Sequence, residues 1–132
     1  MKVTILNNIK LSEEFIGEKT SIWNSNNAYA HNRVYVETEK DSISFDYWGS
    51  VSHPTIDSEY DLIFAFYCLL SDAIAGESDS TFDNFCKEFG YDQDNNSSKI
   101  CYDECKDSFD KCTDLGLNIY DTLNYLIDKY DV

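Results

Sequence analysis

The hydrophobic pattern of this chain changes its period between the first half and the second. In the first half, residues 33–37 and 42–48 alternate between apolar and polar side chains, which is typical of β-strands with one buried face. The residues between these two segments suit a hairpin connection, and residues 3–6 and 20–23 are candidates for further strands. Residues 12–18 also suit a short helix.

The second half has the helical period, in four segments with capping residues or glycine stops at their ends. Gly49 is expected to end the last strand, and His53–Pro54 marks the loop that leaves the sheet. The expected helices run to Ala75 from a cap at Asp57 or Ser58, from Thr81 to Phe89 after Ser80, from Asn96 to Leu115, and from Ile119 to Tyr130, with stops at Gly76, Gly90 and Gly116.

These elements predict a single α+β domain over residues 1–132. A small antiparallel β-sheet is expected within residues 1–56, followed by a cluster of about four α-helices in residues 57–132.

The acidic residues are concentrated in the helical half. The chain has a formal net charge of −15, and residues 57–132 hold eighteen Asp and Glu against five Lys. Its 42% of hydrophobic residues can bury a core, which argues against a disordered acidic tail. Phosphates are repelled by such a surface, so we expect neither direct nucleic-acid binding nor binding to an anionic membrane. A basic protein is the partner that this charge favours.

No segment near the N-terminus has the sustained apolar region of a signal peptide. The longest apolar run, Leu62–Leu70, is too short to span a bilayer. The five cysteines are an odd number, which fits poorly with a complete disulfide framework. We therefore expect a cytoplasmic protein with reduced cysteines.

One face of the third expected helix carries a stripe of four carboxylates at helical spacing: Asp103, Asp107, Asp110 and Asp114. Neighbouring carboxylates repel each other by a few tenths of a kcal/mol. They lie about 5–6 Å apart, similar to backbone phosphates. The stripe is therefore either a solvated face or a surface that imitates nucleic acid for a groove lined by Lys and Arg.

The opposite face of this helix carries Cys101, Cys105 and Cys112 beside Phe109. These thiols either pack in the core or bind a metal together with Cys86. The close CxxC pairs or Cys/His mixtures of structural zinc sites are absent, so we expect core packing. The same expectation holds for Cys68.

Residues 92–98 alternate oxygen-bearing side chains, as a calcium loop does. An EF-hand loop that starts at Asp92 needs Gly, an apolar residue and Glu where this chain has Ser97, Lys99 and Asp103. We expect a helix cap here instead, supplied by Asp94, Asn95 or Asn96. No metal or cofactor is therefore expected.

No sequence motif for catalysis is present, and His31 and His53 lack a recognisable nucleophile partner, so we do not expect an enzyme. Phe45 and Tyr47 share a strand face and are expected in the core. Trp48 lies on the other face and is a candidate anchor for a partner.

Three stretches resemble small proteins encoded by phages and mobile elements of Gram-positive bacteria: ISFDYWGS, CLLSDA and FDNFCKEFGYDQD. The resemblance covers roughly residues 43–113. Short acidic proteins of this kind are similar to anti-CRISPR proteins, several of which inhibit Cas effectors by imitating DNA. The resemblance implies a phage protein that evades host defence in the cytoplasm of the host cell, and it carries over no catalytic residue.

We therefore expect a stoichiometric inhibitor, monomer or homodimer, that docks on the basic DNA-binding groove of a Cas effector. The residues expected to bind the partner are Asp103, Glu104, Asp107, Asp110 and Asp114, with Asp92, Asp94 and Trp48. Two alternatives remain: a module that binds calcium or zinc, and a phage accessory protein that binds another host enzyme through its sheet aromatics.

Overall fold

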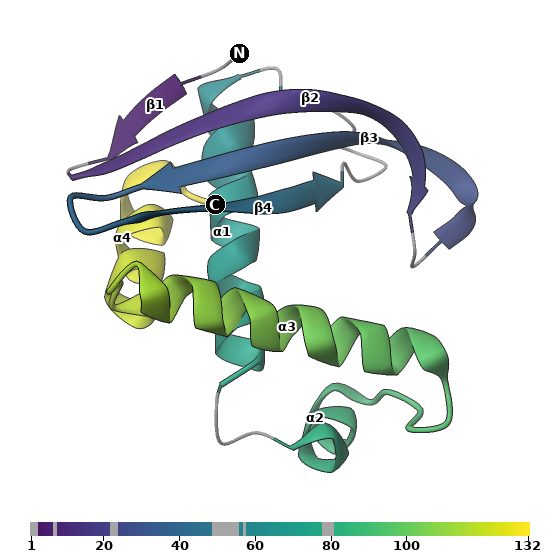
Figure 1. Cartoon of the computed structure of the whole chain (residues 1–132). Coiled ribbons are helices and arrows are strands. Elements are labelled where there is room, and N and C mark those ends of the chain that lie inside the picture. The colour runs from purple at the N-terminus through teal and green to yellow at the C-terminus, as the bar shows by residue number, and fades with distance from the viewer. Residues whose placement is uncertain (1–2, 7, 22–23, 49–55, 57, 78–80) are drawn as a thin grey trace.

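The computed structural model describes residues 3–6, 8–21, 24–48, 56, 58–77 and 81–132. It has the α+β fold that the sequence predicts, an antiparallel sheet followed by helices (Figure 1). The strands are β1 (Val3–Leu6), β2 (Ile9–Ser21), β3 (Asn24–Glu37) and β4 (Ser42–Trp48), which lie in the sheet in chain order. The helices are α1 (Glu59–Ala75), α2 (Phe82–Phe89), α3 (Asn96–Asp114) and α4 (Ile119–Tyr130).

The predicted hairpin is confirmed, because β3 and β4 pair directly and the Thr38 amide donates to the Asp41 carbonyl at 2.9 Å. The short helix considered for residues 12–18 is wrong: these residues belong to β2 and extend the ladder with β3. A β-bulge between Phe15 and Gly17 interrupts this ladder, and Gly17 has φ 152°, a value that side chains disfavour.

The sequence also suggested a strand at residues 20–23, of which residues 22 and 23 lie outside the described residues. Gly49 and His53–Pro54 lie outside them as well. Residues 20 and 21 form the end of β2.

The helix boundaries follow the caps. Ser58 caps α1, Asn95 caps α3, and Gly90 has the left-handed φ of 72° after α2. Helix α2 starts at Phe82, one residue later than predicted, because the Thr81 hydroxyl, rather than Ser80, accepts the amide of Asn84.

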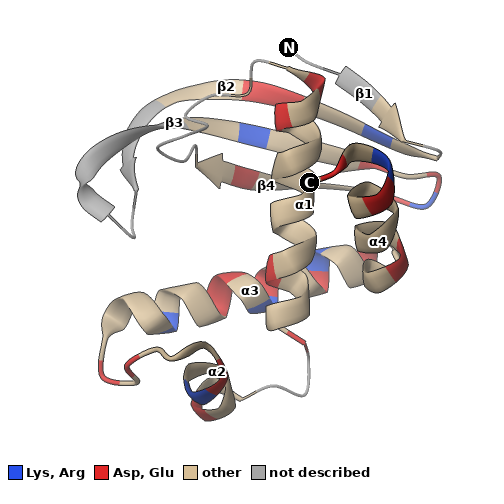
Figure 2. Cartoon of the chain, turned by 180° about the vertical axis from the view of Figure 1, so that it is seen from behind, with Lys and Arg blue, Asp and Glu red and all other residues tan. Residues whose placement is uncertain are grey.

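Helix α1 is the centre of the molecule. It packs on one face of the sheet, α4 lies beside it, and α3 crosses its C-terminal half (Figures 1 and 2). Its buried side chains, among them Phe66 and Leu70, form one core with Val34 of the sheet and Leu126 of α4. Each such side chain contributes roughly 1.5–3 kcal/mol relative to an exposed one. Because α1 contacts both the sheet and α3, it fixes the position of α3 relative to the sheet.

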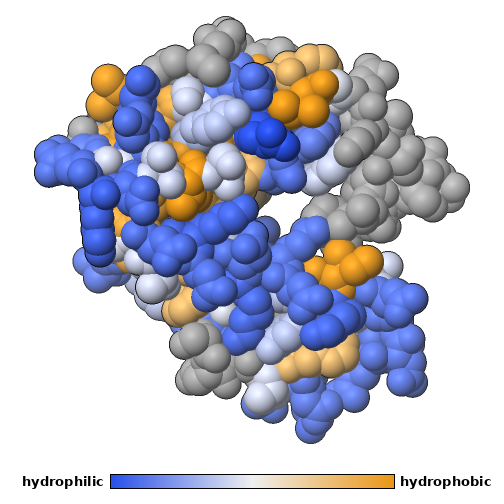
Figure 3. All heavy atoms as spheres, in the orientation of Figure 1, coloured by the Kyte–Doolittle hydropathy of each residue, from blue (hydrophilic) through white to orange (hydrophobic). Residues whose placement is uncertain are grey.

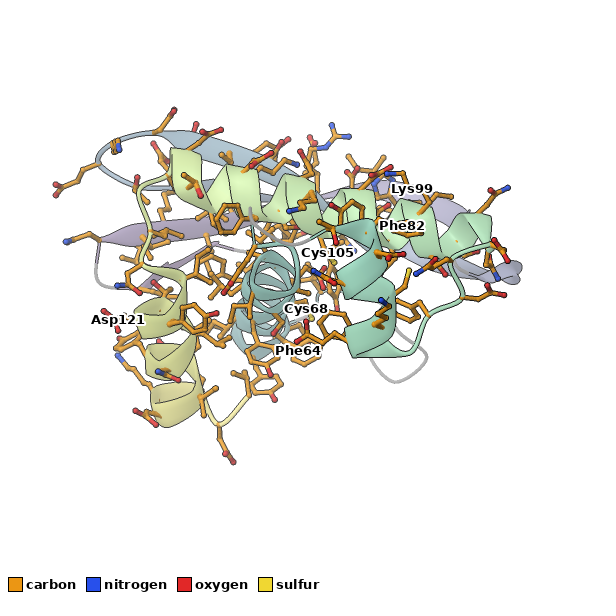
Figure 4. All side chains as sticks on the ribbon, turned by 90° about the horizontal axis from the view of Figure 1, so that it is seen from below. Phe64, Cys68, Phe82, Lys99, Cys105 and Asp121 are labelled. Atoms are coloured by element: carbon orange, nitrogen blue, oxygen red, sulfur yellow. The ribbon has the colours of Figure 1, made fainter. Side chains whose placement is uncertain are left out.

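A second, smaller cluster holds α2 under the N-terminal half of α3. Phe85 and Cys86 of α2 pack there with Cys105 of α3, which turns toward α1 in the view of Figure 4. All five cysteines are free, and the expected core packing is confirmed for the buried thiols Cys86, Cys105 and Cys112. Cys68 and Cys101 are half-buried.

Candidate protein-binding surface

The four aspartates of the predicted stripe are all exposed on the side of α3 that faces away from the core. Cys105 and Cys112 are buried on the opposite side, so the helical period of the sequence places both sets correctly. We call these four residues, Asp103, Asp107, Asp110 and Asp114, the α3 stripe.

Two of these carboxylates have a lysine of the same helix beside them. Lys99 lies 3.1 Å from Asp103, and Lys111 lies 3.1 Å from Asp107, both at i,i+4 spacing. Pairs of this exposed kind contribute about 0.3–0.5 kcal/mol, so a competing cation can replace them. Asp110 and Asp114 have no ion-pair partner among the described residues.

Lys99 is held more firmly than a surface lysine usually is. Its ammonium lies 5.4 Å from the ring centre of Phe82 and 5.0 Å from that of Tyr102, two rings that meet edge to face under α3. Figure 4 shows Lys99 on α3 near Phe82 of α2. The N-terminal end of the α3 stripe is thus partly neutralised, and its C-terminal end keeps its charge.

A cleft of about 400 Å³ lies between the end of β4, the C-terminal half of α1 and the middle of α3. Figure 3 shows a hollow there, between the sheet and α3. Four carboxylates from three elements line the cleft: Asp46, Asp72, Glu104 and Asp107. Lys111 is the one lysine among the lining residues that the structure describes, and Tyr47 and Trp48 supply aromatic walls. We call this cavity the acidic cleft.

The carboxylates of α1 and α3 in the acidic cleft are poorly compensated. Burial, together with the charges of Cys101, Asp72 and other nearby acids, raises the pKa of Glu104 to about 7. Asp72 keeps contact with solvent at the cleft, yet protein atoms crowd its carboxylate and raise its pKa to about 6. A cation that enters the cleft would therefore stabilise the charged forms of both carboxylates.

Asp46 differs because it has partners on the sheet. Partial burial favours its neutral form, but His31 Nε2, which donates to Asp46 Oδ1 at 3.0 Å, and Arg33 outweigh this and lower its pKa. Trp48 stacks on the His31 ring with 4.3 Å between ring centres. Phe45 and Tyr47 are buried as predicted, whereas Trp48 is half-buried at the cleft.

The loop before α3 forms a cap, as predicted. Asn95 Oδ1 accepts the amide of Ser97 at 2.8 Å, and Asp92 Oδ1 accepts the amide of Asp94 at 2.9 Å. Asp92 and Asp94 are exposed, but they lie beyond the N-terminal end of α3 and do not line the acidic cleft. In the part of the chain that the structure describes, no group of three or more His, Cys, Asp or Glu side chains is arranged to hold a metal ion.

The structure thus brings together three of the eight predicted residues, Trp48, Glu104 and Asp107, at the acidic cleft. Asp46 and Asp72 were missed. They are distant in sequence from α3 and from each other, and only the packing of α1 between the sheet and α3 brings them to one cavity. The alternation that points Asp46 away from Phe45 was the one available signal for its exposure.

Comparison with known proteins gives no relative. No protein-family model matches the chain, and no curated protein or solved structure matches it either. Among the described residues, none of the helices has the length and apolar character needed to cross a membrane.

Proposed function

We propose that this protein is a stoichiometric inhibitor of the phage anti-CRISPR type, which binds the basic DNA-binding groove of a CRISPR–Cas effector in place of nucleic acid. The observation that carries the proposal is the gathering of exposed carboxylates along α3. A rod of fixed negative charges at this spacing suits a groove that has evolved to hold phosphates.

Electrostatic complementarity supports binding of this kind more than it supports catalysis. Charged surfaces of opposite sign associate fast, and the rate falls as salt screens them. Lys99 beside Asp103 is exposed and Lys111 beside Asp107 is half-buried. Ion pairs at this spacing contribute only about 0.3–0.5 kcal/mol, so the Lys and Arg side chains of a partner can replace them. The function then needs no bound metal or cofactor.

Charge reversal of the whole α3 stripe tests the proposal. The fourfold Asp→Lys variant should lose inhibition of DNA cleavage across a panel of Cas effectors loaded with guide RNA, because its surface repels the groove. Cleavage of a labelled duplex, measured against inhibitor concentration, gives the readout.

A control variant reverses four exposed acids outside α3 and the acidic cleft, so that it has the same net charge. These are Glu37, Glu39, Glu88 and Asp128. It should inhibit nearly as well as the parent protein. If the stripe variant inhibits as well as this control, imitation of nucleic acid by α3 is wrong.

A further inference from the structure

The outer edge of β4 borders the acidic cleft and has backbone groups that pair with no described strand. In the sheet order β1-β2-β3-β4, the strand β4 has a neighbour on one side only, among the residues that the structure describes. The free edge of β4 faces α3 in Figure 1. An exposed edge of this kind is a template for the addition of another strand.

The hydrogen-bond register shows which backbone groups point outward. Thr38 and Asp41 face each other as a bonded pair, and such pairs alternate along an antiparallel ladder. Ile43, Phe45 and Tyr47 therefore bond to β3, whereas the backbone groups of the residues between them point away from it. The outward residues are Ser42, Ser44, Asp46 and Trp48. The Ser42 amide already bonds to Asp41 Oδ1, at 2.8 Å.

Within the described part of the chain, the backbones of three residues thus remain on the outer edge: Ser44, Asp46 and Trp48. No hydrogen bond from them to another described element is present. Asp46 and Trp48 also line the acidic cleft with their side chains. Backbone donors and acceptors for a strand therefore lie next to carboxylates that attract a cation.

We infer that the acidic cleft and the edge of β4 together receive an extended segment of the partner, which adds to the sheet as a fifth strand and places Lys or Arg side chains among Asp46, Asp72 and Glu104. The inference rests on the proposed function, since it names the part of a basic partner that this protein holds. It assigns the cleft, with Asp107 at its border, to a polypeptide, while Asp103, Asp110 and Asp114 of the α3 stripe face the rest of the basic groove.

The chemistry of the cleft selects the occupant. Side chains of a strand alternate between the two faces, so every second residue of the segment reaches the cleft and should be basic. A volume of about 400 Å³ accepts one or two long side chains. Tyr47 and Trp48 can cover their aliphatic stems, and the carboxylates pair with their charged ends. A polynucleotide has no strand backbone to add and would bring phosphates to carboxylates.

The test uses the intact protein and a synthetic nine-residue peptide with lysine at every second position and threonine between. Titration followed by amide NMR should shift the amide signals of Ser44, Asp46 and Trp48. The double variant Asp72→Asn, Glu104→Gln should bind about tenfold more weakly in calorimetry. The matched double variant Glu88→Gln, Asp128→Asn, which removes the same charge elsewhere, should bind like the parent.

Backbone pairing is tested separately from charge. Ser44→Pro removes an outward amide and is tolerated on an edge strand, so it should weaken binding in a folded protein. A peptide with N-methyl groups on alternate residues keeps its charge and tests pairing without any change in the protein. It should also bind about tenfold more weakly.

The inference is overturned if the N-methylated peptide binds as tightly as the plain one, or if the cleft variant binds like its control. The same holds if the shifted amides lie only along the α3 stripe. No Cas effector takes part in this experiment, so its failure leaves the proposed function standing. Loss of the proposed function would conversely appear in the cleavage assay alone.

Discussion

Glu104 is the residue whose environment departs most clearly from that of a surface carboxylate. Its pKa rises from 4.5 to about 7, so between these values the unfolded chain releases a proton that the folded chain keeps. This contribution to stability is present at low pH and is lost as pH rises toward about 7. Asp46 of β4 and Asp72 of α1 line the same cleft, and Asp107 and Lys111 follow Glu104 on α3; Lys111 is the one lysine among the described lining residues.

The variant Glu104→Gln cannot take up this charge and should therefore melt at a higher temperature than the parent at pH 8. The advantage should shrink toward zero near pH 4.5, where the parent carboxyl is also neutral. Calorimetric melting at several pH values measures it. Asp128→Asn, an exposed change of equal charge, should show no such pH dependence; a Glu104→Gln protein that is less stable at pH 8 would contradict the prediction.

Cys101 should be the most reactive of the five thiols. The Cys105 thiol donates a hydrogen bond to its sulfur, and together with a hydrogen bond from Tyr91 this outweighs partial burial and lowers the pKa of Cys101. Burial raises the pKa of Cys68 and of Cys112 to about 12. At pH 7.5, iodoacetamide should modify Cys101 first, as peptide mapping by mass spectrometry can show.

The variant Cys105→Ala removes the main hydrogen-bond donor to Cys101 and should slow this modification. Faster labelling of Cys68 in the parent protein would contradict the predicted order.

At the scale of elements, the contact between α1 and α3 depends on a glycine. A Cβ on Gly76 would lie 2.1 Å from the carbonyl oxygen of Cys105, and this oxygen belongs to helix backbone that cannot turn aside. Gly76→Ala should therefore destabilise the protein by about 3 kcal/mol or more in urea unfolding.

Gly90→Ala is the matched control, because Gly90 has a left-handed φ of 72° but open space around its Cα. Strain alone should reduce its stability by about 1–2 kcal/mol. If the two variants prove equally stable, α1 and α3 do not pack as closely as the structure has them.

Secondary structure was predicted from the sequence better for some elements than for others, and the reasons are physical. Helix ends are set by local chemistry, such as the Ser58 and Asn95 caps, and each of these was among the candidate caps that the sequence predicted. The segment 12–18 has no strong local preference. Its strand is fixed by pairing with β3, which continues on both sides of the bulge at Gly17, and sequence periodicity does not contain this information.

At the scale of the whole molecule, the α3 stripe was predictable and the acidic cleft was not. The stripe needs only the helical period, which one segment of sequence contains. The cleft needs Asp46 from the sheet, Asp72 from α1 and Glu104 from α3 at one place, and their meeting follows from the angle at which the helices pack. The site that gathers most charge is thus a product of tertiary structure.

The net charge of the whole molecule predicts how its melting temperature depends on salt. With a formal charge of −15, most of it in residues 57–132, the folded chain repels itself, and salt screens this repulsion. Melting temperature should therefore rise between about 10 mM and 150 mM sodium chloride, where the Debye length falls from roughly 30 to 8 Å. The fourfold Asp→Lys variant of the α3 stripe has a formal net charge of −7 instead of −15, so salt should raise its melting temperature clearly less. A melting temperature that falls with salt in the parent protein would mean that attractive ion pairs, such as Lys99–Asp103 and Lys111–Asp107, outweigh the repulsion.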